Sequence, residues 1–311
     1  MRNDPTADLI PVLEIGGTHL ASALVRRGTW CIIPGSTTRH SFDASGSAAA
    51  LIDAMVETMN AVPPGHGQDW VVAIPGPFDY AAGIGQYEHV GKFDSLRGVN
   101  VAEQLSRRLG SARVSLRFLN DADAFGVGEY AVGAARATRR VACITLGTGV
   151  GSAFLDNGEP VNSGDSVPPH GSVHLLEYRG YPLEETVSRR AIRASYAATT
   201  GQSVDEVPDV RELADLSRAG NTAAADVLSS AFAHLGAALA PAMNRFQATT
   251  LVVGGSMAKS WDIVEPALRA GLSREGPALA ALSIRRAERA EESALIGAAF
   301  WCDRQERAAR I

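Results

Sequence analysis

Residues 12–25 read VLEIGGTHLASALV, and this stretch decides the fold of the chain. Apolar residues lead into a glycine pair, and apolar or small residues follow it. The second run lacks the i, i+3, i+4 spacing of an amphipathic helix. We therefore predict a strand, a glycine turn and a second strand.

The same plan returns in the middle of the chain. Residues 142–161 read ACITLGTGVGSAFLDNGEPV, with a glycine turn between two apolar runs. Asn157-Gly158 then predicts a tight hairpin turn into a further strand. A third glycine pair ends an apolar run within residues 251–268, before an expected helix. A hairpin opening that occurs twice, among mixed strands and helices, predicts two similar α/β lobes.

Helices and further strands fill the rest of the chain. Apolar residues at helical spacing predict helices over 47–62, 101–109 and 222–240. Pro241 is expected to interrupt the last of these. Strands are expected at 70–74 and 114–119. No linker rich in Pro, Gly or Ser separates the lobes, so we expect them to pack closely around a cleft that binds two substrates.

Composition excludes several classes of protein. The chain has 311 residues, more than one core usually organises, and 46% hydrophobic residues, too many for a disordered chain. The net charge of −5 gives no electrostatic reason to expect nucleic acid or a membrane surface as partner. No signal-peptide core opens the chain, and we expect no uncharged apolar run of the ~20 residues that a membrane span needs. The three cysteines lack a C-x-x-C pairing, so we expect reduced thiols in a cytoplasmic protein.

The glycine turns limit the kinds of nucleotide site that are possible. The string G-x-x-x-x-G-K-[ST] of a P-loop does not occur, and no glycine turn has the G-x-G-x-x-G spacing that feeds a dinucleotide-binding helix. The remaining interpretation is a hairpin whose backbone N–H groups and threonine hydroxyl face a phosphate tail. A single Gly-Thr turn is more often purely structural. Two such turns in matching positions favour a nucleotide site.

Six segments resemble the ROK family of bacterial sugar kinases and repressors, within the actin and hexokinase superfamily. They are EIGGTHL (14–20), IPGPFD (74–79), LNDADAFGVGE (119–129), TLGTGVGSAFLDNG (145–158), VVGGSMA (252–258) and SALIGAA (293–299). The resemblance implies an α/β, two-lobed, actin-like ATPase (ribonuclease H-like) sugar-kinase fold with a cleft between the lobes. The expected lobes are residues 1–119 with 295–311, and residues 120–294. The DNA-binding segment of the repressor branch has no room before Glu14, so the kinase branch is expected.

The resemblance also implies a nucleotide site that uses ATP and Mg²⁺. Three glycine segments are expected to hold the nucleotide. Their residues are Gly16, Gly17 and Thr18; Gly147, Thr148 and Gly149; and Gly254, Gly255 and Ser256. The carboxylate of Glu14, where the family usually has Asp, is expected to help hold Mg²⁺ through a water molecule.

Catalytic and acceptor-binding roles follow from the same resemblance. Asp121 matches the catalytic base, which takes the proton of the attacking hydroxyl. The competing interpretation is that Asp121 only caps a helix that starts near Ala122. Asp123 is the rival base, although residues two apart do not share a helix face. The expected acceptor-binding residues are Asn120, His174, Glu184 and Gly76.

Several departures from the family pattern bear on the substrate. The segment from His174 to Ser188 has no cysteine, so the family's zinc site cannot be assembled and no zinc is expected. Gly171 stands where the family has a sugar-binding Glu, and the family's Asn and Trp are missing from residues 89–101. The catalytic end therefore looks retained, while the part that grips the far side of the ring looks rebuilt.

The leading interpretation is a kinase for the hydroxymethyl group of a hexose-like acceptor, in a homodimer. A kinase for an amino sugar (kanosamine-like) or a C7-cyclitol is the first alternative, and polyphosphate is a possible donor. A non-catalytic sugar sensor or a DNA-binding repressor is the alternative of another class. Asp121 argues against a sensor, and the acidic net charge argues against a repressor.

Overall fold

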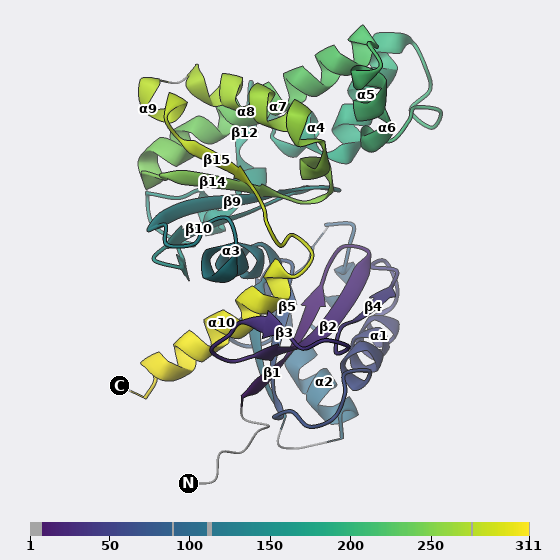
Figure 1. Ribbon diagram of the computed structural model, residues 1–311. Helices are drawn as coiled ribbons and strands as arrows, with labels where there is room; N and C mark the ends of the chain where they lie inside the picture. Colours follow the sequence, from purple (N-terminus) through teal and green to yellow (C-terminus); the bar gives the residue numbers. More distant parts are fainter. Residues whose placement is uncertain (1–7, 89, 111–113, 275, 311) are drawn as a thin grey trace. The chain divides into compact units, whose positions relative to one another are not determined.

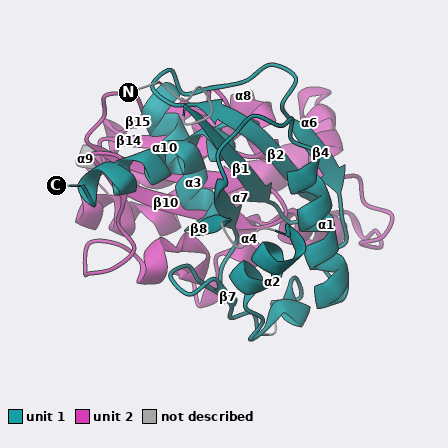
Figure 2. Ribbon diagram, turned by 90° about the horizontal axis from the view of Figure 1, so that it is seen from below, with its two compact units in different colours: residues 1–133, 291–311 teal, residues 134–290 magenta. Residues whose placement is uncertain are grey.

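The chain folds into two compact units, residues 1–133 with 291–311 and residues 134–290 (Figure 2). The computed structural model describes residues 8–88, 90–110, 114–274 and 276–310. Helix α3 (Asp121–Val132) belongs to the first unit, whereas the sequence had led us to begin the second lobe at residue 120. The physical reason is that α3 packs along α10 (Ser293–Ala308), so these two helices stay together.

The first unit is built on a six-stranded sheet in the order β3-β2-β1-β5-β8, with β4 also paired to β2. Figure 1 labels strands β1 to β5 of this sheet. Its strands are β1 (Leu9–Ile15), β2 (His19–Arg26), β3 (Cys31–Ile32), β4 (Thr38–Ser41), β5 (Asp69–Ile74) and β8 (Ser115–Asn120). Strands β1 and β2 form the predicted antiparallel hairpin, and β1, β5 and β8 run parallel. The carboxyl ends of three strands therefore lie at one edge of the sheet.

Helices pack against this sheet. They are α1 (Ala48–Asn60), η1 (Asp94–Leu96), α2 (Val101–Arg108), α3 and α10; a small ribbon of β6 (Phe78–Asp79) and β7 (Ile84–Gly85) lies apart. Helices α3 and α10 approach so closely that a β-carbon on Gly128 would collide with the Ser293 carbonyl. The fully buried Glu129 accepts a hydrogen bond from the Ser293 hydroxyl at 2.6 Å. This close contact joins the two separate stretches of sequence that make up the first unit.

The second unit repeats the plan in a five-stranded sheet, β11-β10-β9-β14-β15. Its strands are β9 (Arg140–Leu146), β10 (Val150–Asp156), β11 (Glu159–Pro160), β14 (Thr250–Gly254) and β15 (Ser283–Arg286). Strands β9 and β10 form the second glycine hairpin, and β14 runs parallel to β9 and β15. Asn157 and Gly158 turn β10 into β11 with φ angles of 51° and 80°, which confirms the predicted hairpin.

Helix α7 (Thr222–Phe246) lies at the core of the second unit and corrects two expectations. It continues through Pro241 instead of breaking there, because Ala240 and Ala242 on either side are fully buried while Pro241 faces outward. The helix is also apolar enough to cross a membrane, with a mean hydropathy of 1.3 over an 18-residue window, although no such run was expected. Of that window, 56% is buried inside the unit, so core packing accounts for its apolar character.

The remaining elements of the second unit surround α7. They are η2 (Pro169–Gly171), η3 (Val173–Leu175), β12 (Glu177–Tyr178), β13 (Tyr181–Pro182), α4 (Glu184–Val187), α5 (Arg189–Thr200), α6 (Val210–Arg218), η4 (Ser256–Ser260), α8 (Trp261–Ser273) and α9 (Pro277–Ala280). The helix expected after Gly254-Gly255 is α8, preceded by the 3₁₀ turn η4.

Candidate active site

The carboxyl edge of the first unit's sheet gathers several of the predicted site residues. Glu14 lies near the end of β1, and the turn at residues 16–18 leads into β2. In the parallel register, Glu14 is opposite Ala73 of β5, and Ile74 is opposite Asn120 at the end of β8. Asp121 follows directly as the first residue of α3. The fold thus brings a glycine turn and two carboxylates to the same edge.

A cavity of about 240 Å³ opens at the first glycine turn. It is lined by Glu14, Gly16, Gly17, Thr18, His19, Ala21 and Arg39. The turn is short and held by its own backbone, because the Gly16 amide donates to the His19 carbonyl at 2.9 Å. A polar concavity with a glycine floor and an adjacent carboxylate has the features of a phosphate and cation site.

The two carboxylates of this edge hold protons unusually well. Burial raises the pKa of Glu14 to about 7; the nearby Asp121 carboxylate raises it further and the Arg39 guanidinium offsets part of the effect. Burial also raises the pKa of Asp121 to about 6, against the backbone N–H of Ala122, which lowers it. A carboxylate whose pKa lies close to neutral is suited to accept a proton.

Asn120 caps helix α3, so the cap is not Asp121. The Asn120 side-chain oxygen accepts hydrogen bonds from the amides of Ala122 and Asp123 at 3.0 and 3.2 Å. One oxygen of Asp121 accepts from the adjacent Ala122 amide, at 2.9 Å. The N-cap of α3 is therefore Asn120, and capping does not explain the presence of Asp121. Its rival Asp123 is 4% exposed and lies inside the unit.

Gly76 and Asn120 meet around Tyr80, a residue that no sequence motif had singled out. The Asn120 amide nitrogen donates to the Tyr80 hydroxyl at 2.9 Å, and that hydroxyl donates to the Ile74 carbonyl at 3.3 Å. A β-carbon placed on Gly76 would lie 3.2 Å from the same hydroxyl. Tyr80 therefore orients the amide group that we expected to bind the acceptor. A tyrosine six residues after the strand gave no local signal of this.

The second unit brings the other two glycine segments together at the end of its sheet. Thr145 of β9 is opposite Gly254 of β14, so the turn at Gly147, Thr148 and Gly149 lies beside Gly255 and Ser256. A β-carbon on Gly147 would lie 3.7 Å from the Ser256 hydroxyl oxygen. Gly255 has a φ of 85° and packs on Leu146, where a larger residue would collide with the backbone. The sequence had placed each of these segments at the end of a strand, and the structure adds that the two strands are neighbours.

The Glu184 side chain lies against the second glycine turn, although the sequence had predicted that it binds the acceptor. Its carboxylate accepts a hydrogen bond from the Val150 amide at 2.9 Å. Its oxygen occupies the space beside Gly149 in which a β-carbon would otherwise lie. The structure thus joins a residue expected to bind the acceptor to a turn expected to bind phosphate.

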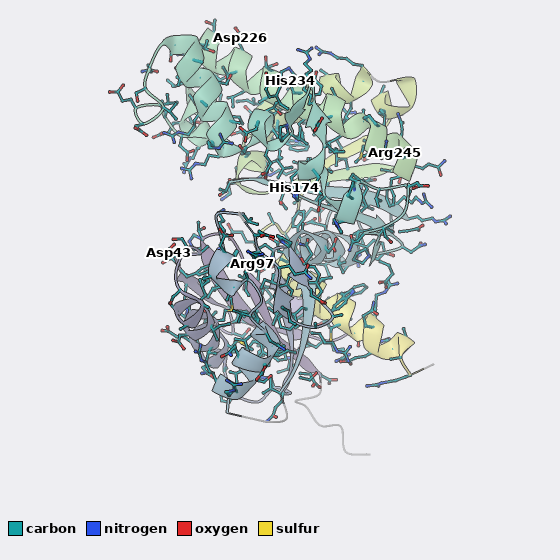
Figure 3. All side chains as sticks on the ribbon, turned by 180° about the vertical axis from the view of Figure 1, so that it is seen from behind. Asp43, Arg97, His174, Asp226, His234 and Arg245 are labelled. Carbon is teal, nitrogen blue, oxygen red and sulfur yellow. The ribbon has the colours of Figure 1, made fainter. Side chains whose placement is uncertain are left out.

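The segment with His174 is fixed to β10 by Ser152. The Ser152 hydroxyl donates to the Gly171 carbonyl at 2.6 Å and accepts from the Val173 amide at 2.9 Å. His174 itself is exposed on η3 (Figure 3). Gly171 is buried with a φ of 67°, and a β-carbon there would lie 2.8 Å from the Asn162 side-chain oxygen. No ordinary side chain fits at position 171 without a local shift.

The first glycine turn suits Mg²⁺ only in part. Within the described ranges, no three His, Cys, Asp or Glu side chains form a group that could hold a metal ion. Protein sites for Mg²⁺ often supply one or two carboxylates and leave the other positions to phosphates and water. Glu14, which lines the same cavity as Thr18, meets that smaller requirement, and it could hold such an ion next to a bound phosphate.

Known proteins with similar sequences and folds place the chain in a family. It is 27% identical over 285 residues to a glucokinase of Thermotoga maritima, covering 85% of this chain and 87% of that protein. It is 22% identical over 245 residues to the DNA-binding transcriptional repressor Mlc of Escherichia coli, covering 74% of this chain and 59% of the repressor. The solved structure of a Streptomyces griseus ROK family glucokinase in complex with glucose and AMPPNP has a TM-score of 0.74 at 21% identity, over 94% of this chain and 98% of that one. The ROK family model matches residues 12–305, and the chain therefore belongs to the ROK family.

Proposed function

We propose that the chain is a sugar kinase that transfers the terminal phosphoryl group of ATP to a hydroxymethyl group of a hexose-like acceptor. The observation that carries this is the Asp121 carboxylate, with a pKa raised to about 6, at the same sheet edge as Glu14 and the first glycine turn. The glucokinase relative and the AMPPNP-bound neighbour support a kinase over other functions of this fold.

Each residue would have a defined part in the transfer. The acceptor hydroxyl oxygen attacks the terminal phosphorus, the bond from phosphorus to the bridging oxygen breaks, and ADP leaves with that electron pair. The hydroxyl proton passes to the Asp121 carboxylate. The Asn120 amide, held by Tyr80, orients the acceptor beside Gly76. Mg²⁺, held by Glu14 through a water molecule, would offset the charge of the phosphates.

The second unit has nucleotide-binding candidates of its own. The amides and hydroxyl at Thr148 and Gly149 would face phosphate, with Gly254, Gly255 and Ser256 beside them for the nucleoside. The Val150 amide is already bound to Glu184, so it is not counted among these donors.

An acceptor screen tests the proposal directly. Purified protein, ATP and Mg²⁺ are incubated with hexoses, amino sugars and C7-cyclitols, and ADP release is measured. Turnover with at least one hydroxymethyl-bearing acceptor is expected. A non-catalytic sensor or repressor, favoured only by the relationship to the E. coli repressor, would bind a sugar in the same panel without releasing ADP.

A further inference from the structure

Lys92 lies directly over the first glycine turn. A β-carbon built on Gly17 would be 2.9 Å from the Lys92 ammonium nitrogen, closer than real side chains approach. A side chain at position 17 would displace the ammonium group, which is the flexible end of Lys92. Lys92 comes from a loop far along the chain from the turn.

The loop that carries Lys92 is ordered by its own contacts. The Asp94 carboxylate accepts hydrogen bonds from the amides of Val90 and Gly91, at 3.1 and 3.2 Å. The buried Phe93, next to Lys92, donates its amide to the Ala44 carbonyl at 2.8 Å. The ammonium group is thus presented by a fixed backbone, which reduces the entropy cost of using it to bind a ligand.

Arg39 is a second cation near the first glycine turn. It lies on β4, opposite Ala21 of β2, and it lines the cavity with Glu14 and Gly17. Among the residues that the structure describes, no carboxylate lies within 4.0 Å of the charged groups of Arg39 or Lys92. These two cations therefore flank a turn that exposes backbone N–H groups. Such a set of donors fits an anion with several oxygens.

We propose that Arg39 and Lys92 bind the terminal phosphoryl group of the donor at the first glycine turn. This inference rests on the proposed kinase function and assigns that site two further binding residues. Arg presents a planar set of N–H donors to phosphate oxygens, and Lys adds a compact point charge. The Glu14 carboxylate, which lines the cavity with Arg39, also lies close enough to Asp121 for that charge to raise its pKa, so the cavity favours the transferred end of the phosphate chain over the nucleoside.

Nucleotide affinity, measured by calorimetry, tests this assignment apart from catalysis. The full-length protein and the variants Arg39→Met and Lys92→Met are titrated with AMPPNP and with ADP in the presence of Mg²⁺. Losing a charge-assisted hydrogen bond should weaken AMPPNP binding about tenfold or more. ADP lacks the terminal phosphoryl group, so its Kd should change by less than about threefold. Arg107→Met is the matched control, because Arg107 is an exposed residue of α2 paired with its neighbour Glu103.

The other outcomes are equally informative. Equal losses for AMPPNP and ADP, or no loss for either, would overturn the assignment. Titration of tripolyphosphate and of glucose 6-phosphate separates a donor phosphate from an acidic acceptor; a Lys92-dependent loss confined to glucose 6-phosphate would also overturn it. If the unmodified protein binds no AMPPNP, the kinase proposal fails. Lys92-dependent binding of tripolyphosphate would then still support a phosphate site, and no binding would refute both.

Discussion

The Glu184 carboxylate accepts a hydrogen bond from the Val150 amide at 2.9 Å, so an acidic side chain closes one side of the second glycine turn. Glu184→Ala removes this acceptor, and we expect the turn to loosen and ADP binding to weaken about tenfold. Glu184→Gln keeps an oxygen that can accept the same hydrogen bond, so it should restore binding to within about threefold. Calorimetric titration with ADP measures both.

Glu185→Ala is the control for this pair of variants. Glu185 is the next residue on α4, is exposed, and pairs with Arg190 on the surface. Its loss should leave ADP affinity unchanged. If Glu184→Ala instead keeps its ADP affinity and raises only the KM for the acceptor, Glu184 is an acceptor ligand, as the family resemblance first implied.

Asp121→Asn should abolish most of the turnover. The amide keeps the shape of the side chain but cannot take the hydroxyl proton, so kcat should fall by about 10²–10⁴ or more. Nucleotide affinity should be largely kept, because the backbone donors of the glycine turns remain. Steady-state kinetics with the best acceptor of the screen, alongside a calorimetric titration with ADP, give the two values. Near-normal turnover would show that another group accepts the proton.

The raised pKa of Asp121 predicts how activity depends on pH. The base acts in its ionised form, so kcat should fall as pH drops below about 6, approaching tenfold per unit. Above that value the rate should level off. A pH profile of kcat with saturating substrates gives the midpoint, and a midpoint near the ordinary aspartate value of 3.8 would contradict the assignment.

The same shift predicts that Asp121 weakens the folded state at neutral pH. A carboxyl group whose pKa is higher in the folded than in the unfolded chain binds protons more tightly when folded. The ionised form therefore costs stability above about 6, and the cost disappears as pH falls below the unfolded value. Asp121→Asn should raise the free energy of unfolding by roughly 1–3 kcal/mol at pH 8 and by much less at pH 4. Urea unfolding at the two pH values measures the difference.

Gly171 predicts an acceptor preference unlike that of a glucokinase. With no side chain at that position, a sugar that relied on a carboxylate there would lose one charged hydrogen bond, worth about 1.5–3 kcal/mol. We therefore expect an amino sugar or a cyclitol to exceed glucose in kcat/KM by about tenfold or more. Glucose at the top of a broad panel would contradict the substrate prediction.

Restoring a carboxylate at this position should fail for a structural reason. In Gly171→Glu, the left-handed backbone and the nearby Asn162 oxygen both oppose the new side chain, so it should destabilise the protein without improving activity on glucose. Gly164→Glu is the matched control, since Gly164 has a φ of 89° but no atom within 4 Å of the place that a β-carbon would take. A loss of stability in Gly171→Glu beyond that in Gly164→Glu measures the collision with Asn162. Equal losses of stability in the two variants would show that the Asn162 side chain moves aside.

The sequence predicted those parts of the molecule whose signals are local. The hairpins around Gly16-Gly17 and Gly147–Gly149 could be predicted because a glycine turn between two apolar runs specifies its own geometry. The contacts of Lys92 with Gly17 and of Glu184 with Val150 could not be predicted from the sequence, because they join segments that are far apart along the chain. At Pro241 a local signal was misleading. Proline usually breaks a helix, but here the burial of its two neighbours keeps α7 continuous.

The contact of Gly128 with Ser293 also sets an order on how the protein is made. The second unit is continuous in sequence, whereas the first needs α10, which follows the second unit in the sequence. Until α10 is made, the face of α3 that carries Gly128 lacks the helix that packs on it. The packing of the first unit is therefore completed only after the whole second unit has been synthesised.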